Sequence, residues 1–199
     1  MTNREKSRPK HISIQTGEFH VSRERVIIST LLGSCISACL YDPVKNVVGM
    51  NHFLLSNNKY SQNMPVCTTD AGRYGIQAME LVISGMFRLG AERSNLRAKV
   101  FGGSSFFSTP DEADNFFCVG EVNCRFIQDF LKDRGIPLIA NDLGGDRGRI
   151  IHFSSVDFSV KVRKIPKTKS PTILDMEKRF WRQSIEDRRR AADEMDLWT

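Results

Sequence analysis

The chain has 199 residues, of which 40% are hydrophobic, and a formal net charge of +6. This length suffices for one sizeable globular domain, and no apolar run approaches the roughly 20 residues that a membrane span needs. The basic N-terminus is not followed by the apolar stretch of a signal peptide, so we expect a cytoplasmic protein without membrane insertion.

The positive charge favours acidic partners in general. Lysine and arginine are nevertheless scattered among acidic residues, and the sequence contains neither a recognition-helix signature nor an aromatic–basic RNA-binding motif. We therefore interpret the charge as a solvated surface that suits an acidic protein, and we do not expect nucleic-acid binding.

The cysteines favour neither disulfides nor a metal site. Five cysteines cannot all pair, and neither a C-x-x-C motif nor a histidine pair with ligand spacing is present. We expect reduced thiols, most of them buried, and no zinc site. The cysteines are Cys35, Cys39, Cys67, Cys118 and Cys124.

The chain begins with a basic segment, residues 1–10, which we predict to be a disordered arm. Residues 11–22 contain short apolar segments on either side of Gly17, a pattern typical of two short strands with a bend between them. Residues 26–32 are almost continuously apolar and predict a buried strand that leads into Gly33.

Residues 29–55 carry the strongest functional signal of the sequence. They contain two apolar, β-branched segments separated by a turn signal at residues 42–46. Pro43 presets φ at the second turn position, and Asn46 tolerates the left-handed conformation that closes such loops. Two strands with so short a link are expected to form an antiparallel hairpin.

This hairpin is expected to bring a cysteine and a histidine together. In the register with the shortest loop, Cys35 lies directly opposite His52. In a register with two more loop residues, Ser37 faces His52 and Cys35 is its diagonal neighbour. Both registers place the thiol and the imidazole on one face, roughly 4.5–8 Å apart at Cβ, whereas a slip of one residue separates them.

A thiol beside an imidazole is the minimum equipment of a thiolate nucleophile. The imidazole of His52 accepts the thiol proton of Cys35 and later returns it to a leaving amine. Gly33 and Ser34 let the backbone approach a substrate carbonyl and aim an N–H at a developing oxyanion. The alternative is structural, because a buried cysteine packs as a small hydrophobe and a histidine is often a satisfied core residue.

After the hairpin, residues 56–64 are polar and predict a loop. Apolar residues spaced three and four apart predict an amphipathic helix over residues 68–92, with Gly90 at its end. The same spacing predicts a second helix over residues 120–134, which Gly135 terminates.

Short strands complete the body of the chain. The Gly-rich turn at residues 141–148 lacks the G-K-[ST] motif and the helix of a phosphate-binding loop, so we do not expect a nucleotide site there. The predicted strands are residues 97–101, 136–140, 149–154 and 158–165, and residues 104–115 form a predicted loop.

Three parts follow from these elements: the arm of residues 1–10, a domain of residues 11–166, and a helical extension of residues 167–199. The extension begins with a Pro-bounded linker, and Asp175 is suited to cap its helix. Because strands come first and then alternate irregularly with helices, we expect an α/β (α+β) fold, a layered sandwich of mixed β-sheet with two main flanking helices and the C-terminal helical tail.

Five ordered motifs carry a resemblance to a known family. They are L-L-G-S-C-I-S-A-C-L-Y-D-P around Cys35, G-M-N-H-F-L-L around His52, A-K-V-F-G-G at residues 98–103, G-E-V-N at residues 120–123 and N-D-L-G-G-D-R-G-R at residues 141–149. With these motifs at family-like spacing, residues 12–165 resemble the chemoreceptor glutamine deamidases (CheD).

The resemblance implies a layered α/β fold and an active site made of a cysteine, a histidine and a threonine. Cys35 and His52 match the first two residues. The family threonine lies six positions before the cysteine, where this chain has Ser29. We therefore assign Ser29 to orient His52, with the adjacent Thr30 as the fallback. A second departure is Ser56, where a proline usually follows the histidine strand.

The resemblance also implies a reaction and its partners. Such enzymes convert receptor glutamines to glutamates through a thioester, and some also act on receptor methyl esters; neither a metal nor an organic cofactor is implied. The expected substrate is the cytoplasmic domain of a chemoreceptor. Similar proteins also bind a CheC-type phosphatase of the chemotaxis response regulator, so a binding module is the alternative, although the intact Cys35–His52 pair favours an enzyme.

Overall fold

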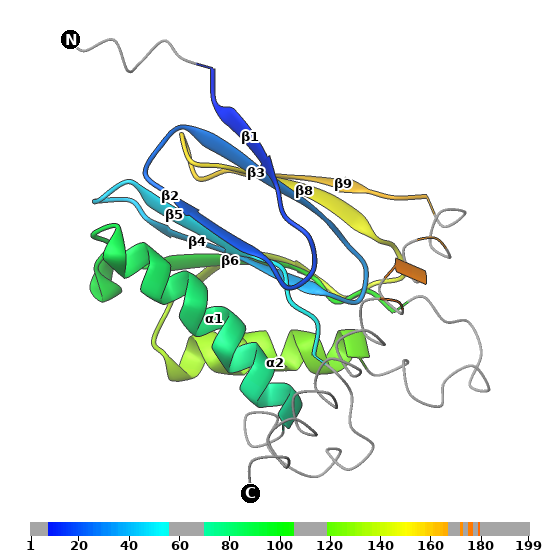
Figure 1. Ribbon diagram of the computed structural model, residues 1–199. Helices are drawn as coiled ribbons and strands as arrows, with labels where there is room; N and C mark the ends of the chain where they lie inside the picture. The colour runs from blue at the N-terminus through cyan, green and yellow to red at the C-terminus, as the bar shows by residue number, and fades with distance from the viewer. Residues whose placement is uncertain are drawn as a thin grey trace, which may run out of the picture.

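The computed structural model describes residues 8–55, 70–105 and 119–166, together with residues 172, 175, 176 and 179. Its body has three layers: two stacked β-sheets, and two α-helices that cover the outer face of one of them (Figure 1). The helices are α1 (Asp70–Arg88), α2 (Val119–Asp133) and a short 3-10 helix, η3 (Arg93–Asn95).

One sheet has four strands in the order β1-β3-β8-β9, and the other has five in the order β2-β5-β4-β6-β7. Both sheets are mixed, because β1 runs parallel to β3 and β6 parallel to β7, while the other pairs are antiparallel. The predicted α+β sandwich is confirmed, although the sequence does not predict its division into two sheets. The strands are β1 (Lys10–Ser13), β2 (Phe19–Ser22), β3 (Val26–Leu32), β4 (Ile36–Asp42), β5 (Val47–Asn51), β6 (Arg97–Gly102), β7 (Leu138–Leu143), β8 (Arg149–Ser154) and β9 (Val160–Lys164).

Most elements lie where the sequence predicts them, with three differences. Lys10 begins β1 and is not part of a disordered arm. The strand predicted at residues 136–140 begins at Leu138 and runs into the predicted Gly-rich turn, because its pairing with β6 continues to Leu143. The first predicted helix is shorter than residues 68–92 and ends at Arg88. Some predictions concern residues outside the described ones: residues 1–7, the loop at 56–64, most of the loop at 104–115 and most of the C-terminal extension.

Strand β4 is central to the core. All seven of its residues are buried, because the helices cover one face of the five-stranded sheet and the four-stranded sheet covers the other. A strand covered on both faces needs no alternation of polar and apolar residues. Strand β3 has the opposite pattern, in which every second residue from Val26 to Leu32 is buried and points into the sandwich.

The turn between β4 and β5 sets the register of the predicted hairpin. Asp42 Oδ1 accepts hydrogen bonds from the backbone N–H groups of Val44 and Lys45 at 2.8 and 2.9 Å. Asn46 has a φ of 53°, the left-handed conformation predicted for it. Asp42 pairs with Val47, so the hairpin adopts the longer of the two predicted loops.

The Asp42 carboxylate also accepts a third backbone hydrogen bond, from Glu92 at 2.9 Å. Burial would by itself raise the pKa of Asp42, but these backbone donors hold its pKa below the usual value. Asp42→Ala is expected to lower the free energy of unfolding by about 2 kcal/mol at pH 7, since three backbone donors lose their acceptor. Urea unfolding measures this difference.

The pH dependence of the unfolding free energy provides a second test of the role of Asp42. A carboxylate with a lowered pKa stabilises the fold above its unfolded pKa of about 3.9 and loses that contribution as the pH falls further. The gap between wild type and Asp42→Ala should therefore narrow between pH 5 and the lowest pH at which the fold persists. Asp133→Ala, at an exposed position, is the matched control, and equal unfolding free energies for the two variants would contradict the role of Asp42.

Arg149 joins the two sheets from a wholly buried position. Its guanidinium donates to the Asp142 carboxylate and to Ser104 Oγ, both at 2.9 Å, and to the carbonyl groups of Asp142 and Gly144. Asp142 also pairs with Lys164 at 2.7 Å. The Gly-rich turn thus wraps around an arginine of its own chain.

Candidate active site

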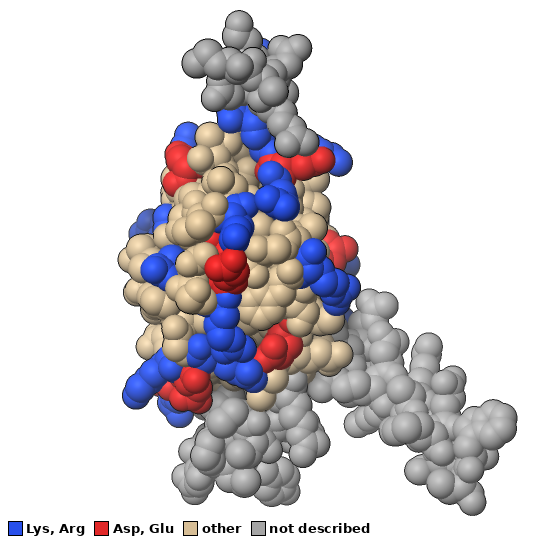
Figure 2. All heavy atoms as spheres, turned by 90° about the vertical axis from the view of Figure 1, so that its left-hand side faces the viewer, with Lys and Arg blue, Asp and Glu red and all other residues tan. Residues whose placement is uncertain are grey.

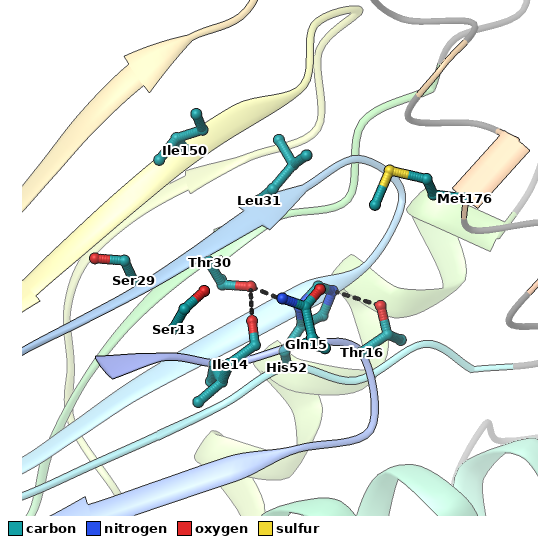
Figure 3. A pocket seen from close by; sticks show the side chains of 10 residues that line it. All are labelled: Ser13, Ile14, Gln15, Thr16, Ser29, Thr30, Leu31, His52, Ile150 and Met176. Carbon is teal, nitrogen blue, oxygen red and sulfur yellow. Dashed lines mark hydrogen bonds between the residues drawn. The ribbon is translucent and has the colours of Figure 1, made fainter. Parts of the chain in front are cut away.

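Side chains from separate segments meet at one end of the sandwich (Figure 3). Thr30 lies near the end of β3, His52 directly follows β5, and Thr16 lies in the connection between β1 and β2. Cys35 directly precedes β4, in the turn that carries the chain from the four-stranded to the five-stranded sheet. Cys35 and His52 are almost wholly buried, with exposed fractions of 0% and 4%.

The cysteine and the histidine predicted from the hairpin contact the same hydroxyl group. Thr16 Oγ1 lies 3.2 Å from His52 Nε2 and 4.0 Å from Cys35 Sγ. In the observed register Ile36 pairs with Phe53, so Cys35 is the diagonal neighbour of His52. The structure therefore brings the predicted thiol and imidazole together, and their catalytic roles stay predictions.

Hydrogen bonds fix the tautomer of His52. Thr30 Oγ1 lies 2.7 Å from His52 Nδ1 and donates its only proton to the carbonyl of Ile14, also at 2.7 Å. The Thr30 hydroxyl must then accept the second bond, so Nδ1 carries a proton. Nε2 consequently holds the lone pair of a neutral ring, and it accepts the hydroxyl proton of Thr16.

Burial lowers the pKa of His52 to about 3. The ring is therefore neutral at physiological pH. A neutral imidazole with Nδ1 protonated presents Nε2 as a proton acceptor, which is the form that a general base requires.

Ser29, the residue assigned from the family spacing, does not contact His52. Its hydroxyl lies 2.7 Å from Nδ1 of His152, its partner across the pairing of β3 with β8. Neighbouring residues of a strand point to opposite faces, and Thr30 is the one that points into the sandwich. The partner of His52 in the structure is thus the fallback residue, Thr30, and the assignment of Ser29 to that place is corrected.

Each carbonyl group of the turn at residues 33–35, just before β4, accepts a hydrogen bond. The donors come from the two residues that directly follow β6 and from α2, so two further parts of the chain position the cysteine backbone. The bonds, all of 2.8 Å, run from the backbone N–H of Ser104 to Gly33, from Asn123 Nδ2 to Ser34 and from the backbone N–H of Gly103 to Cys35. Gly102 permits this approach, since a Cβ there would collide with the Cys35 carbonyl oxygen.

Asn123 is a supporting residue that ends the G-E-V-N motif and to which the sequence analysis gives no role. It is wholly buried in α2, and its amide oxygen accepts a hydrogen bond from the backbone N–H of Leu55 at 2.9 Å. Its amide group thereby links the turn before Cys35 to the chain that follows His52. The available signal is an asparagine at a buried position of an otherwise apolar helix face.

A cavity of about 420 Å³ opens beside the imidazole (Figure 3). His52, Thr30 and Thr16 belong to its lining, and the Cys35 thiol lies behind them in contact with Thr16. The other lining residues combine short polar and apolar side chains: Ser13, Ile14, Gln15, Ser29, Leu31, Ile150 and Met176.

A second hollow, of about 800 Å³, involves the turn at the opposite end of the β4–β5 hairpin, and its lining contains no cysteine, histidine, serine or threonine. Figure 2 shows this end of the molecule, where lysine and arginine side chains are interspersed with acidic ones. Lys45 in this hollow is already paired with Glu92 at 2.9 Å. The imidazole of His52 thus lines the first cavity, with the Cys35 thiol behind it. The second hollow is lined by Arg8, Lys10, Arg23, Glu24, Arg25, Lys45 and Asn46.

The described residues contain no group of three or more His, Cys, Asp or Glu residues placed to hold a metal ion. Within the same part of the chain, no helix is long and apolar enough to cross a membrane.

Comparisons with known proteins agree with the motifs. The model of one family, described as CheD chemotactic sensory transduction, matches residues 54–164. The chain is 51% identical over 187 residues to the probable chemoreceptor glutamine deamidase CheD 1 of Geobacter sulfurreducens, covering 94% of this chain and 93% of that protein. It is 38% identical over 194 residues to the probable chemoreceptor glutamine deamidase CheD 2 of Shewanella oneidensis, covering 94% of each.

A solved structure is similar only at low level. The Bacillus licheniformis hypothetical protein YfiH matches with a TM-score of 0.37 and 17% identity, covering 62% of this chain and 49% of that one. A likeness of this size supports no functional argument.

Proposed function

The chain belongs to the CheD family, and we propose that it is a chemoreceptor glutamine deamidase with Cys35 as its nucleophile. The observation that carries this proposal is the placement of the Cys35 thiol and the His52 imidazole around one hydroxyl group, beside a cavity that His52 lines. The relatives named chemoreceptor glutamine deamidases supply the substrate class.

The reaction begins with attack of the Cys35 sulfur on the side-chain carboxamide carbon of a receptor glutamine. Because His52 is neutral at rest, it takes up the thiol proton as the sulfur attacks. The C–N bond of the tetrahedral intermediate then breaks, and the proton held by His52 leaves with ammonia. A water molecule that His52 deprotonates hydrolyses the thioester, which yields glutamate and restores the thiol.

Thr30 supports this cycle by its hydrogen bond with Nδ1. It keeps the ring in the tautomer whose unprotonated Nε2 contacts the Thr16 hydroxyl, and it accepts a stronger hydrogen bond when the ring becomes positively charged. The Ile14 carbonyl fixes the direction of that hydroxyl. The role that the sequence analysis gives to Ser29 therefore passes to Thr30.

Thr30→Val is expected to reduce the turnover number for deamidation roughly 10- to 100-fold, because the imidazole loses the partner that orients it. Ser29→Ala should change turnover by less than about twofold, since its hydroxyl binds His152 on the other face of the strand. Thr30→Ser retains the hydroxyl and should recover most of the activity. Steady-state kinetics on a receptor fragment measures all three, and a larger loss for Ser29→Ala would return the role to Ser29.

The proposed function is tested with purified protein and the cytoplasmic fragment of a chemoreceptor. Conversion of glutamine to glutamate replaces an amide NH₂ by OH, and mass spectrometry of receptor peptides detects the resulting mass increase. We expect time-dependent conversion that vanishes in a Cys35→Ser protein.

The alternative is a binding module that regulates a response-regulator phosphatase. It predicts unmodified receptor peptides and a change in phosphatase activity that Cys35→Ser retains. This combination of results would refute the deamidase proposal.

A further inference from the structure

The β1–β2 connection delivers a hydroxyl group to the point between the thiol and the imidazole. Two backbone hydrogen bonds join this connection to His52. The N–H of Gly17 donates to the His52 carbonyl at 2.7 Å, and the N–H of His52 donates to the Glu18 carbonyl at 3.0 Å. Gly17 has a φ of 89°, which allows the tight bend. Thr16 is therefore held in place by the backbone of the residue that it contacts.

The hydrogen bonds around His52 leave one direction for the proton of Thr16. The proton of Thr30 lies on the Ile14 carbonyl, so Nδ1 of His52 is protonated and Nε2 is the acceptor. Thr16 consequently donates to Nε2 at 3.2 Å. Its oxygen lone pairs then remain as the acceptor for an S–H donor, and Cys35 Sγ lies 4.0 Å from that oxygen.

From this order of donors we propose that Thr16 is a further catalytic residue, which relays the thiol proton of Cys35 to His52. The S–H bond breaks as its proton binds Thr16 Oγ1, and the Thr16 O–H bond breaks as its proton binds Nε2. The hydroxyl ends with one proton, as it began. The sulfur gains the negative charge and the imidazole the positive charge, so atoms and charge balance without a further reactant.

This relay differs from the role of Thr30. Thr30 accepts a hydrogen bond from the nitrogen that stays protonated throughout, whereas Thr16 touches the nitrogen that gains the proton and the sulfur that loses it. Thr16 also lines the cavity beside His52. Its hydroxyl therefore lies on the path that the proton takes from the thiol to the imidazole.

The test uses the reactivity of Cys35 itself and needs no receptor. Iodoacetamide alkylates thiolates, and tandem mass spectrometry assigns the label to Cys35 even though Cys39 lies on the same tryptic peptide. Thr16→Val keeps the side-chain shape and removes the hydroxyl. Cys35 of this variant should be alkylated at least about tenfold more slowly at pH 7, with a rate profile displaced to higher pH.

Thr16→Ser is the matched variant, because it keeps the hydroxyl and loses only a methyl group. It should be alkylated within about twofold of wild type and show the same pH profile. Cys124, which is partly exposed, reports on the fold in the same digests and should react equally in all three proteins. The relay would be overturned if Cys35 of Thr16→Val were alkylated at the wild-type rate. It would also be overturned if Thr16→Ser slowed the alkylation of Cys35 as much as Thr16→Val does.

The catalytic role of Thr16 rests on the proposed function, but the relay and the deamidase activity are tested by separate measurements. If receptor fragments are not deamidated while alkylation of Cys35 still depends on the Thr16 hydroxyl, the relay stands and the deamidase proposal falls. If deamidation proceeds and Thr16→Val reacts like wild type in both assays, the deamidase proposal stands and the relay falls.

Discussion

Cys35→Ser is expected to reduce receptor deamidation at least about 1,000-fold while the protein remains folded. A serine hydroxyl is a far weaker acid than a thiol, so a neutral imidazole cannot activate it to the same degree. The substitution is nearly isosteric, and the carbonyl of residue 35 keeps its hydrogen bond from Gly103. Mass spectrometry of receptor peptides gives the activity, and thermal unfolding confirms the fold.

Cys39→Ser is the matched control, at a second buried cysteine of the same segment. Burial raises the pKa of the Cys39 thiol, and its pairing places it opposite Met50 rather than beside a base. Turnover within about threefold of wild type is expected for this variant, because it loses packing but no reactive group. Wild-type turnover in Cys35→Ser would refute the thioester mechanism, whichever result Cys39→Ser gives.

Arg149→Met should lower the free energy of unfolding by about 3–5 kcal/mol, the largest stability effect that we predict. Methionine fills much of the space but leaves Ser104 Oγ and the Gly144 carbonyl without their guanidinium donor. Ser104 also donates its backbone N–H to Gly33, so the turn before Cys35 should loosen as well. Denaturant unfolding measures the loss, and the turnover number should fall with it.

Arg147→Met provides the comparison in the same turn. Its partner is Asp146 at 3.8 Å, and both side chains are more than half exposed. An exposed pair of this kind contributes at most about 1 kcal/mol, so this variant should unfold within about 0.5 kcal/mol of wild type. Equal losses in the two variants would show that the turn, and not the buried guanidinium, determines the stability.

The sequence predicts the β4–β5 hairpin correctly because the signals for it are local. Pro43 and Asn46 define a turn, and the period of two in a strand places Cys35 and His52 on one face in either register. The choice between the registers depends on Asp42, whose carboxylate receives a hydrogen bond from the distant Glu92. A contact between residues so far apart leaves no mark on local spacing.

The choice between Ser29 and Thr30 shows a different limit. Both residues carry a hydroxyl and lie side by side in an apolar strand, so the sequence does not tell which of them points inward. The answer depends on how β3 pairs with β8 and on which face meets the second sheet. Spacing taken from the family therefore selects Ser29, whereas the hydrogen bonds of the structure select Thr30.

The sequence does not reveal the roles of Arg149 and Thr16, because each residue type is ordinary in the segment where it occurs. Arginine is rarely buried, so an arginine after a Gly-rich turn is expected to be solvated. A threonine beside a glycine in a polar connection is typical of an ordinary turn. Their importance arises from the close approach of segments distant in the chain, Arg149 to Asp142 and Ser104, and Thr16 to His52.

The order of the strands has a consequence for the protein during its synthesis. All four side chains of the proposed site lie within residues 16–52, which leave the ribosome early. Strand β3 nevertheless pairs with β8, and β4 with β6, both of which are translated much later. A nascent chain thus contains the side chains of the proposed site before it contains the strands that position them. If Cys35 is the nucleophile proposed above, its thiol should become reactive only after the last strands have emerged.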